Sequence, residues 1–361
     1  MSAVSPTAGR DPLAGRLPVT VITGFLGSGK TTLIRRLLAH PGMNRAAVIV
    51  NEFGEVGIDH DLVAASSESV TLLSNGCLCC VVRTDLQETL RELFAKRRAG
   101  EVIDFDRVLV ETSGLADPAP VVQTLATDTL LAAQYRLDGV VTLVDAVNGA
   151  DQLEREAESV KQAVLADRLL VTKTDLASAE LATALRERLR RVNPHAELAD
   201  VVQGEIDPAF LTGIGLASTR AGAAQVGRWL GVGKEGGGAY LGALAPRHDR
   251  AILTFTLRFD QPFSWRTFSA AMELLTGLRG PDLLRVKGLV NIAGESGPVV
   301  VQGVQHVFHP PVTLAAWPTE DRRSRLVFIT RNIPEEAVVA LFDAAGRLEG
   351  RPSLSPTGGE G

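Results

Sequence analysis

A run of residues near the start of the chain has the types and spacing needed to hold phosphate groups. From Gly24 to Thr31 the sequence reads G-F-L-G-S-G-K-T, which fits G-x-x-x-x-G-K-[ST] and lies between an apolar segment and a helical one. Glycines there let backbone N–H groups turn toward phosphate oxygens, a lysine reaches the β- and γ-phosphates, and a hydroxyl ligates Mg²⁺. We expect nucleotide contacts from Gly24, Gly27, Ser28, Gly29, Lys30, Thr31 and Thr32, with Lys30 also catalytic and Thr31 on Mg²⁺. The alternative is a glycine-rich turn with an exposed lysine.

An acid and a glycine follow a second apolar segment. Glu111 ends the run Arg107–Glu111, and Gly114 comes three residues later in E-T-S-G. A carboxylate at such a strand end can act on Mg²⁺ or its waters, and the Gly114 N–H can sense a γ-phosphate. We therefore predict that Glu111 is a catalytic and Mg²⁺-binding residue. A solvated acid at a strand end is the alternative, which the nearby phosphate loop makes the weaker one.

A third motif indicates recognition of a purine base. The run L-L-V-T-K-T-D places Lys173 and Asp175 just beyond another strand, at the ligand-binding edge of a parallel sheet. An aspartate can accept hydrogen bonds from guanine N1–H and N2–H₂, and adenine lacks that donor pair, so we expect GTP rather than ATP. Asn193, which begins a later loop, is expected to touch the base edge. Alone, the motif also fits an ordinary surface turn.

The three cysteines of the chain, Cys77, Cys79 and Cys80, all lie in G-C-L-C-C. An odd count cannot form a paired disulfide framework within one chain, and adjacent cysteines on a regular strand cannot both face one core. Thiolates prefer soft or borderline metals, so we expect a Zn²⁺ site, with Co²⁺ or Cu(I) as alternatives. Three sulfurs leave a fourth tetrahedral position open, which suits a site that passes its metal on. A redox pair and buried apolar thiols are the competing interpretations.

The segment Asn51–Asp59, N-E-F-G-E-V-G-I-D, carries acids among glycines directly after a predicted strand. A loop of this kind can rearrange around Mg²⁺ and a γ-phosphate, so we expect a nucleotide-dependent switch. Glu52 is predicted either to ligate the transferred metal beside the cysteines or to order a catalytic water. The residue types do not decide between these two roles.

Charge and hydropathy exclude several classes of partner. The 361 residues carry a formal net charge of -5, with acids and bases interspersed and no basic block that could neutralise a row of phosphates. Nucleic acid is therefore not an expected partner. No apolar run approaches the ~20 residues that span a bilayer, and residues 1–16 lack the apolar core of a signal peptide. We expect a cytoplasmic protein that does not enter a membrane.

These motifs need a parallel sheet to bring them together. Short β-type runs alternate with helical patterns, which predicts an α/β fold, a P-loop NTPase domain whose mostly parallel sheet is covered by helices on both faces. The expected strands are Pro18–Thr23, Ala46–Asn51, Arg107–Glu111, Gly139–Val144, Arg168–Thr172 and Ala196–Val202. The expected helices are Thr31–Ala39, Thr84–Arg98, Gln152–Ala166 and Ser178–Val192.

The length of the chain favours two hydrophobic cores. We expect a disordered N-terminus at 1–16, a nucleotide domain at 17–221, a glycine-rich linker at 222–249, a smaller α+β domain at 250–346 and a disordered tail at 347–361. In the second domain we expect strands at Ala251–Phe259, Leu283–Ala293, Pro298–Val304 and Arg325–Thr330, and helices at Trp265–Thr276 and Pro334–Ala345.

Together these motifs resemble the CobW family of P-loop GTPases. The matching runs are Gly24–Thr32, Asn51–Asp59, Gly76–Cys80, Glu111–Pro118 and Thr172–Asp175, and L-R-V-K-G at Leu284–Gly288, Trp317 and R-L-V-F-I at Arg325–Ile329 resemble the family's C-terminal domain. The resemblance implies GTP hydrolysis coupled to insertion or trafficking of a metal, with GTP, Mg²⁺ and Zn²⁺ bound and a client metalloprotein as partner. It also implies a nucleotide domain akin to those of the nickel-insertion GTPases of urease and hydrogenase.

The sequence departs from the family pattern in two places. Residues 222–246 contain no histidine, whereas members often carry a histidine-rich stretch near the domain junction, so bulk metal storage is not expected. The selector T-K-T-D replaces the commoner N-K-x-D, and threonine lacks the amide that pairs with guanine N7, so we expect weaker base affinity.

Our hypothesis is that the γ-phosphate sets the geometry of the Glu52 and cysteine loops, and that hydrolysis releases the metal. No arginine finger or catalytic glutamine is evident, so we expect slow turnover that a client can stimulate. The rival interpretations are a P-loop small-molecule kinase and a GTPase whose zinc is purely structural. The physiological metal, the client and the formation of a homodimer stay open.

Overall fold

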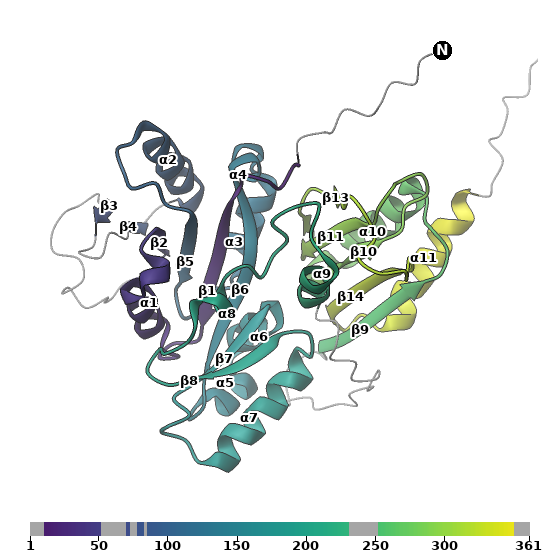
Figure 1. Ribbon diagram of the computed structural model, residues 1–361. Coiled ribbons are helices and arrows are strands. Elements are labelled where there is room, and N and C mark those ends of the chain that lie inside the picture. Colours follow the sequence, from purple (N-terminus) through teal and green to yellow (C-terminus); the bar gives the residue numbers. More distant parts are fainter. Residues whose placement is uncertain (1–10, 52–69, 73–77, 83–84, 231–251, 350–361) are drawn as a thin grey trace, which may run out of the picture.

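The computed structural model describes residues 11–51, 70–72, 78–82, 85–230 and 252–349 (Figure 1). For residues 51, 70–72, 78–82 and 348–349 it gives the course of the backbone alone. Two sheets dominate it, a mostly parallel one within residues 17–201 and an antiparallel one within residues 252–331. The predicted α/β fold with an α+β part after it is confirmed.

The first sheet has the strand order β3-β4-β2-β5-β1-β6-β7-β8 among the described residues. The strands are β1 (Leu17–Gly24), β2 (Ala46–Asn51), β3 (Val70–Leu72), β4 (Leu78–Val82), β5 (Arg107–Thr112), β6 (Tyr135–Asp145), β7 (Arg168–Thr172) and β8 (Glu197–Val201). All neighbours are parallel except β3 and β4. Strands β2 to β5 lie on one side of β1, and strands β6 to β8 lie on the other. The strand order therefore reverses direction at β1, and at such a point a crevice for a ligand is expected beyond the carboxyl end of the strand.

Helices cover both faces of this sheet, as predicted. They are α1 (Lys30–Ala39), α2 (Leu86–Ala99), α3 (Ala119–Thr127), α4 (Thr129–Gln134), α5 (Gly149–Arg155), α6 (Ala157–Leu165), α7 (Ala179–Val192) and α8 (Pro208–Leu211). Val19 and Val21 of β1 pack with residues of α2, α3 and α4, whereas Ile22 packs with α1 and α8. Because strand side chains alternate between faces, this split places α1 and the phosphate loop on the face opposite α2, α3 and α4.

The second sheet is antiparallel and has the order β12-β11-β10-β14-β9, with β13 also paired to β11. Its strands are β9 (Ile252–Phe259), β10 (Leu283–Val290), β11 (Val299–Val304), β12 (Val307–Phe308), β13 (Val312–Thr313) and β14 (Ser324–Arg331), and its helices are α10 (Trp265–Arg279) and α11 (Glu335–Glu349). One face packs on the two helices around Phe268, Phe328 and Phe342. Most of β10 is buried, because its other face packs on the first part of the molecule.

A buried ion cluster joins the two sheets. Asp167, just before β7, accepts hydrogen bonds from Arg285 at 2.7 Å and Lys287 at 3.0 Å, both on β10. Arg285 also donates to the carbonyl of Leu165 at the end of α6. Burial alone raises the pKa of Asp167, but the charges of Arg285 and Lys287 outweigh it and hold the pKa well below its usual value of 3.8. The apolar neighbours Leu284 and Ile329 complete this interface.

The predicted linker 222–249 is wrong in its first part. Residues Ala223–Leu230 form helix α9, whose Val226, Trp229 and Leu230 are buried against Leu289 of β10 and other apolar residues. Their spacing of three and four residues is that of an apolar helix face, and burying this face offsets the entropy that the surrounding glycines cost. Residues 231–249 lie outside the described part of the chain.

The predicted disorder at both ends also needs correction. Asp11 accepts hydrogen bonds from Ser218 Oγ at 2.5 Å and from the Thr219 N–H at 3.0 Å, and Leu13 packs beside α9. Residues 11–16 are therefore anchored by contacts more than 200 residues away, which no local pattern could indicate. At the other end α11 runs to Glu349, so residues 347–349 are helical; residues 350–361 are outside the described chain.

Two further elements differ from expectation. The single helix predicted at Gln152–Ala166 is two helices, α5 and α6, because Glu156 takes an extended conformation with φ −112° and ψ 112°. Strand β6 begins at Tyr135, four residues before the predicted start. No helix in the described residues is both long enough and apolar enough to cross a bilayer.

Candidate functional site

The phosphate loop joins β1 to α1 through three glycines with positive φ. Gly24, Gly27 and Gly29 have φ values of 145°, 72° and 97°, which residues with a side chain rarely adopt. A Cβ on Gly24 would lie 2.4 Å from the Leu143 carbonyl oxygen of β6, so only glycine lets the loop pass there. The hydroxyl of Ser28 is buried and has no hydrogen-bond partner among the described residues. An orphaned polar atom in such a loop fits a site that takes a polar ligand.

Lys30 and Thr31 open α1 at the mouth of this loop. The Lys30 ammonium donates to the carbonyls of Gly24 at 2.8 Å and Phe25 at 3.3 Å, so the loop itself holds its positive charge in place. Thr31 Oγ1 donates to Glu111 Oε1 at 3.3 Å, although 80 residues separate them. A hydroxyl and a carboxylate oxygen side by side are the hard ligands that Mg²⁺ prefers. The residues present therefore fit a Mg²⁺–nucleotide.

Gly114 lies against the phosphate loop. A Cβ added to it would meet the Leu26 backbone N at 2.8 Å and Cα at 2.9 Å, so the two loops touch backbone to backbone. The carbonyls of Gly114 and Ala116 accept hydrogen bonds from the amide of Gln162 on α6, at 3.1 and 3.0 Å. Gln162 is 1% exposed and thus fixes the loop after β5 from the helix beneath it. Any displacement of the loop after β5 therefore acts on α6 through these hydrogen bonds.

Lys173 and Asp175 lie on the other side of the phosphate loop. Thr172 Oγ1 donates to the Ser28 carbonyl at 2.8 Å, which fixes the end of β7 against the phosphate loop. Lys173 has a positive φ of 57° and its ammonium donates to Asp145 Oδ2 at 2.7 Å. Asp175 follows in a turn and is exposed. Lys173 and Asp175 thus stand beyond the carboxyl end of β7, where the sequence predicts the base.

Asp145 ends β6 and supports this base-side loop. Its carboxylate accepts hydrogen bonds from the N–H groups of Val147 and Asn148 as well as from Lys173. Burial opposes its ionisation, but the hydrogen bonds from Lys173, Val147 and Asn148 outweigh burial and lower the pKa of Asp145. Asp145 is therefore a stable anion that holds the Lys173 side chain.

The expectation that Asn193 touches the base edge is wrong. Asn193 is 2% exposed, and its amide donates to the carbonyls of Ala163, Val164 and Ala166 while its oxygen accepts from the Ala196 N–H. All its hydrogen-bonding capacity is used inside the protein, joining the end of α7 to the end of α6. Asn193 looked suitable because a loop asparagine near a sheet edge has the right functional group, but its fold context takes that group away.

The cysteine segment lies in the same sheet as the phosphate site. Cys79 and Cys80 belong to β4, which pairs in parallel with β2, and β2 pairs in parallel with β5. The register places Cys80 opposite Ile49 and Ile49 opposite Val110, the residue before Glu111. With strands about 4.8 Å apart, the Cys80 backbone is about 10 Å from that of Val110. The two chemistries predicted from the sequence are thus neighbours across one intervening strand.

Other predicted metal ligands lie outside the described residues. Cys77 and Glu52 both do; Asn51, the residue before Glu52 in the sequence, pairs with Thr112 of β5. Within the residues that the structure describes, no group of three or more His, Cys, Asp or Glu side chains is arranged to hold a metal. The prediction of a site at Cys77, Cys79, Cys80 and Glu52 therefore stays a prediction.

Two residues of the site, Asp145 and Gln162, were not singled out in the sequence. Each holds a predicted site residue or its loop through a hydrogen bond, which spans 28 residues for Asp145 and 48 for Gln162. Thr172 was singled out as the first residue of T-K-T-D, but its hydrogen bond to the phosphate loop, which spans 144 residues, was not predicted. A weak signal existed for Asp145, an acid directly after an apolar strand, as for Glu111. Gln162 carries no such signal, because a polar residue in a helix is ordinarily solvated.

The fold and the site define a P-loop nucleotide-binding protein. Residues 18–200 match the family of the CobW/HypB/UreG nucleotide-binding domain, and residues 252–346 match the cobalamin synthesis protein CobW C-terminal domain. The chain therefore belongs to the CobW family, and the resemblance noted in the sequence is confirmed.

Similar proteins extend along nearly the whole chain. The zinc chaperone YjiA of Escherichia coli is 35% identical over 333 residues, which cover 90% of this chain and 98% of YjiA. The zinc chaperone CobW of Pseudomonas aeruginosa is 32% identical over 363 residues, 90% of each chain. The crystal structure of the Zn(II)-bound YjiA GTPase from E. coli superposes with a TM-score of 0.66 at 32% identity, covering 91% of this chain and 99% of that one. These relatives share both parts of the molecule.

Proposed function

We propose that this protein is a GTP-hydrolysing metallochaperone that couples its nucleotide state to the binding and transfer of Zn²⁺, with Co²⁺ as an alternative cargo. The observation that carries the proposal is the shared sheet: only β2 separates β4, with Cys79 and Cys80, from β5, which carries Glu111 next to its last residue. The relatives named zinc chaperones support zinc as the cargo. A relative in Schizosaccharomyces pombe, 36% identical over 53% of this chain and 47% of its own length, is named a zinc-regulated GTPase metalloprotein activator.

The chain's own residues divide the work of hydrolysis. The ammonium of Lys30 neutralises charge on the β- and γ-phosphates, and the loop glycines present backbone N–H groups to the same oxygens. Thr31 and Glu111 would hold Mg²⁺, and the bound ion would neutralise charge that develops on the phosphate oxygens. Gly114 senses the γ-phosphate, and Glu52 orders the attacking water or joins the metal ligands.

Guanine is selected by the loop after β7. Lys173, held by Asp145, packs along the base, and the exposed carboxylate of Asp175 is open to accept from guanine N1–H and N2–H₂. Because adenine cannot donate both hydrogen bonds, an ATP-dependent kinase would need a different selector.

Zinc is bound by Cys77, Cys79 and Cys80 and leaves when the γ-phosphate is lost. Hydrolysis releases the contact at Gly114, and the neighbouring strands β5 and β2 pass the change to β4 and to the loop that begins at Glu52. A client metalloprotein, held by the antiparallel C-terminal sheet, then receives the metal. The transfer needs reduced thiols, which suits the cytoplasm.

A zinc titration in two nucleotide states tests the proposal. Purified protein is titrated with Zn²⁺ against a competing chelator, once with GDP and once with a non-hydrolysable GTP analogue, for the wild type and for Cys79→Ser. We expect zinc affinity to differ at least tenfold between the two nucleotides, and to fall in Cys79→Ser without loss of GDP binding. The predicted nucleotide-binding residues, Ser28 and Thr32 among them, are the same in both proteins, so nucleotide affinity is the internal control.

Two results would contradict the proposal. Equal zinc affinity with both nucleotides would leave a GTPase whose cysteines are not coupled to its switch. If a chelator unfolds the protein, measured by circular dichroism, the zinc is structural and not a transferable cargo.

A further inference from the structure

A cleft lies between the two sheets, on the side away from the phosphate loop. It is bounded by the N-terminal segment 11–16, by α3, α4 and the start of β6, by Trp229 of α9, and by β11 and the residues after β12. Its cavity volume is about 80 Å³, and its mouth opens to solvent, so the cavity takes part of a small ligand while the rest lies in the mouth. Nothing in the nucleotide or zinc chemistry uses it.

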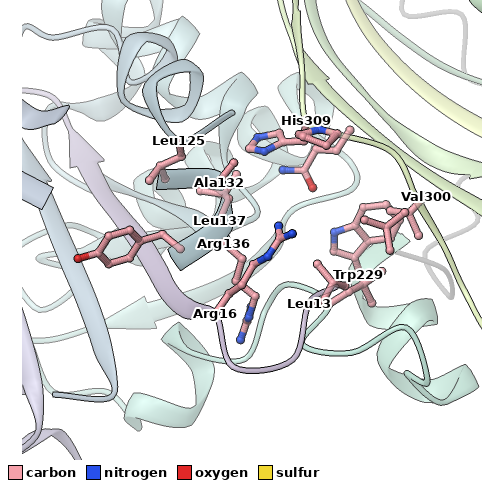
Figure 2. A pocket seen from close by; sticks show the side chains of 14 residues that line it. Leu13, Arg16, Leu125, Ala132, Arg136, Leu137, Trp229, Val300 and His309 are labelled. Carbon is pink, nitrogen blue, oxygen red and sulfur yellow. The ribbon is translucent and has the colours of Figure 1, made fainter. Parts of the chain in front are cut away.

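Two guanidinium groups enter this cleft from one side. Figure 2 shows Arg16 and Arg136 next to each other, with Trp229 and Val300 on the opposite side and His309 above them. Arg136 is held by one ion pair, to Asp138 at 2.9 Å. Both oxygens of Asp138 are also engaged by the N–H groups of Gly213 and Gly215. Arg136 is therefore a fixed cation and not a mobile surface side chain.

Arg16 has less compensation than Arg136. Its guanidinium makes no hydrogen bond and no ion pair with any described residue, and the carboxylate that acts on it from further away, Asp11, is occupied by Ser218 and Thr219. Burial lowers the pKa of Arg16, and Asp11 opposes that shift. A half-buried guanidinium without a partner is a favourable position for an added anion.

A neutral imidazole adds a directional hydrogen-bonding group. His309 Nε2 is buried and has no hydrogen-bond partner among the described residues. Burial first, and then the charge of Arg285, lower the pKa of His309 to about 4, so the ring is uncharged at neutral pH. No Asp or Glu is among the residues that line the cleft. The polar groups present, Arg16, Arg136, Gln302 and His309, thus favour a negatively charged ligand over a cation.

The remaining walls are apolar. Leu125 and Leu137 line one side, Val300 and Val312 the other, and the Trp229 indole supplies a flat surface. Apolar walls with a few convergent polar groups are the usual composition of small-molecule sites. We propose that this cleft binds a small organic anion, with a carboxylate facing Arg16 and Arg136 and a flat apolar body against Trp229. Because its walls come from both sheets, the ligand also bridges the two parts of the chain.

Calorimetric titration of the full chain with 1-naphthoate tests this site. The protein is metal-free and saturated with GDP, so the phosphate loop is already filled. We expect saturable binding at a dissociation constant of about 1 mM or tighter, and at least tenfold weaker binding of the neutral methyl ester of 1-naphthoate. The Arg16→Gln variant loses the charge without losing any hydrogen bond in the protein, so it should fold normally and bind 1-naphthoate at least tenfold more weakly.

Matched controls separate the site from general charge effects. Arg266 is exposed on α10, which contributes no residue to the cleft, and Arg266→Gln should leave 1-naphthoate affinity unchanged. Gln302→Glu, which puts a carboxylate into the cleft, should abolish binding while GDP affinity stays the same. The proposal is overturned if the wild type shows no saturable binding of 1-naphthoate at concentrations up to 10 times the expected dissociation constant of about 1 mM. It is also overturned if the methyl ester binds as tightly as 1-naphthoate, or if Arg16→Gln and Arg266→Gln have the same affinity for 1-naphthoate. GDP affinity is measured for the same proteins and tests the nucleotide site separately, so a failure of the cleft proposal is distinguishable from a failure of the proposed function.

Discussion

At the scale of single residues, the site depends on side chains that hold others in place. Lys30 is held by two carbonyls of its own loop, Thr31 by Glu111, and Lys173 by Asp145. Each of these contacts orients a group before any nucleotide arrives, so less ordering is left to be done on binding. The hydrogen bond between Thr31 and Glu111 in particular brings a hydroxyl from the segment after β1 and a carboxylate from the end of β5 together.

We predict that Asp145→Asn weakens guanine nucleotide binding about tenfold. Asparagine can still accept from the Val147 N–H, but the loss of charge removes the ionic part of the bond that holds Lys173 in its positive-φ conformation. Because the pKa of Asp145 is lowered, wild-type GDP affinity should show no Asp145-dependent loss as pH falls from 7 to 5. Fluorescent GDP titrations measure both effects.

Asp151 supplies the control for this experiment. It is exposed on α5 and pairs only with Arg155 at the surface, so Asp151→Asn should leave GDP affinity unchanged. Equal losses in both variants would show that Asp145 acts only through general charge.

At the scale of elements, the loops after β1 and β5 are fitted to each other. Gly114 is a glycine because the backbone of Leu26 occupies the place of a Cβ, and Gln162 of α6 fixes the same loop from below. The sheet brings the ends of β1, β5 and β7 to one edge, and these hydrogen bonds then set the distances between their loops. Helix α6 fixes the loop after β5 through Gln162 and contacts the second sheet through Leu165 at its end. It can therefore transmit a displacement of that loop to the second sheet.

We predict that Gly114→Ala lowers GTP hydrolysis and nucleotide affinity at least tenfold. The added Cβ would lie 2.8 Å from the Leu26 backbone N, and backbone cannot move aside as a flexible side chain can. Phosphate release and GDP titration measure the loss, and circular dichroism checks that the fold is kept. Gly277→Ala on α10 is the control, because nothing lies within 4 Å of the new Cβ and alanine favours the helix by roughly 0.5–1 kcal/mol. Normal activity in Gly114→Ala would contradict the close fit of these loops.

The phosphate loop, Glu111 and the two-sheet architecture were predictable because each follows from local spacing. A glycine pattern between a strand and a helix needs no knowledge of distant residues, and alternation of strands and helices fixes a parallel sheet. Gln162 was not predictable, because its partner lies 48 residues away and any polar residue type fits a helix surface. Asp145 had only the weak signal of an acid after an apolar strand, and its partner Lys173 lies 28 residues away. Helix α9 was missed because residues 222–246 contain eight glycines, although the apolar spacing of the helix was present. The glycine content was given more weight than the periodicity in that interpretation.

At the scale of the whole molecule, the two parts are joined by a buried charged contact. Asp167, Arg285 and Lys287 have side chains only 6%, 7% and 14% exposed, and Leu284 and Ile329 pack beside them in the core of β7 and α6. Such an interface is more than a tether, because separating the sheets would leave three ionised groups unpaired. The orientation of the sheets is therefore part of the folded state.

We predict that Asp167→Asn destabilises the protein by about 3–5 kcal/mol at pH 7, because Arg285 and Lys287 are left buried without an anion. The folded-state pKa of Asp167 is below its unfolded value, so the cluster stabilises the fold above about pH 4 and this contribution is lost as the pH falls further. Denaturant unfolding from pH 7 to pH 3 should show the wild type and the variant converging at low pH. Asp200→Asn breaks the partly exposed pair with Arg186 and should cost less than about 1 kcal/mol. A parallel offset at every pH would contradict the ionic origin of the effect.

The order of the strands has one more consequence, for the size of a client. β4 stands near one edge of the first sheet, and the antiparallel sheet attaches near β7, five strand spacings away or about 24 Å (Figure 1). If the second sheet binds the client, the client's metal-binding side chains must reach about 24 Å to the cysteines of β4. A folded domain of about 100 residues has a radius of gyration near 13 Å and can do so. A short peptide from the same client would bind the second sheet but would not reach the cysteines and so would receive no metal. Metal-transfer assays therefore need the intact client domain.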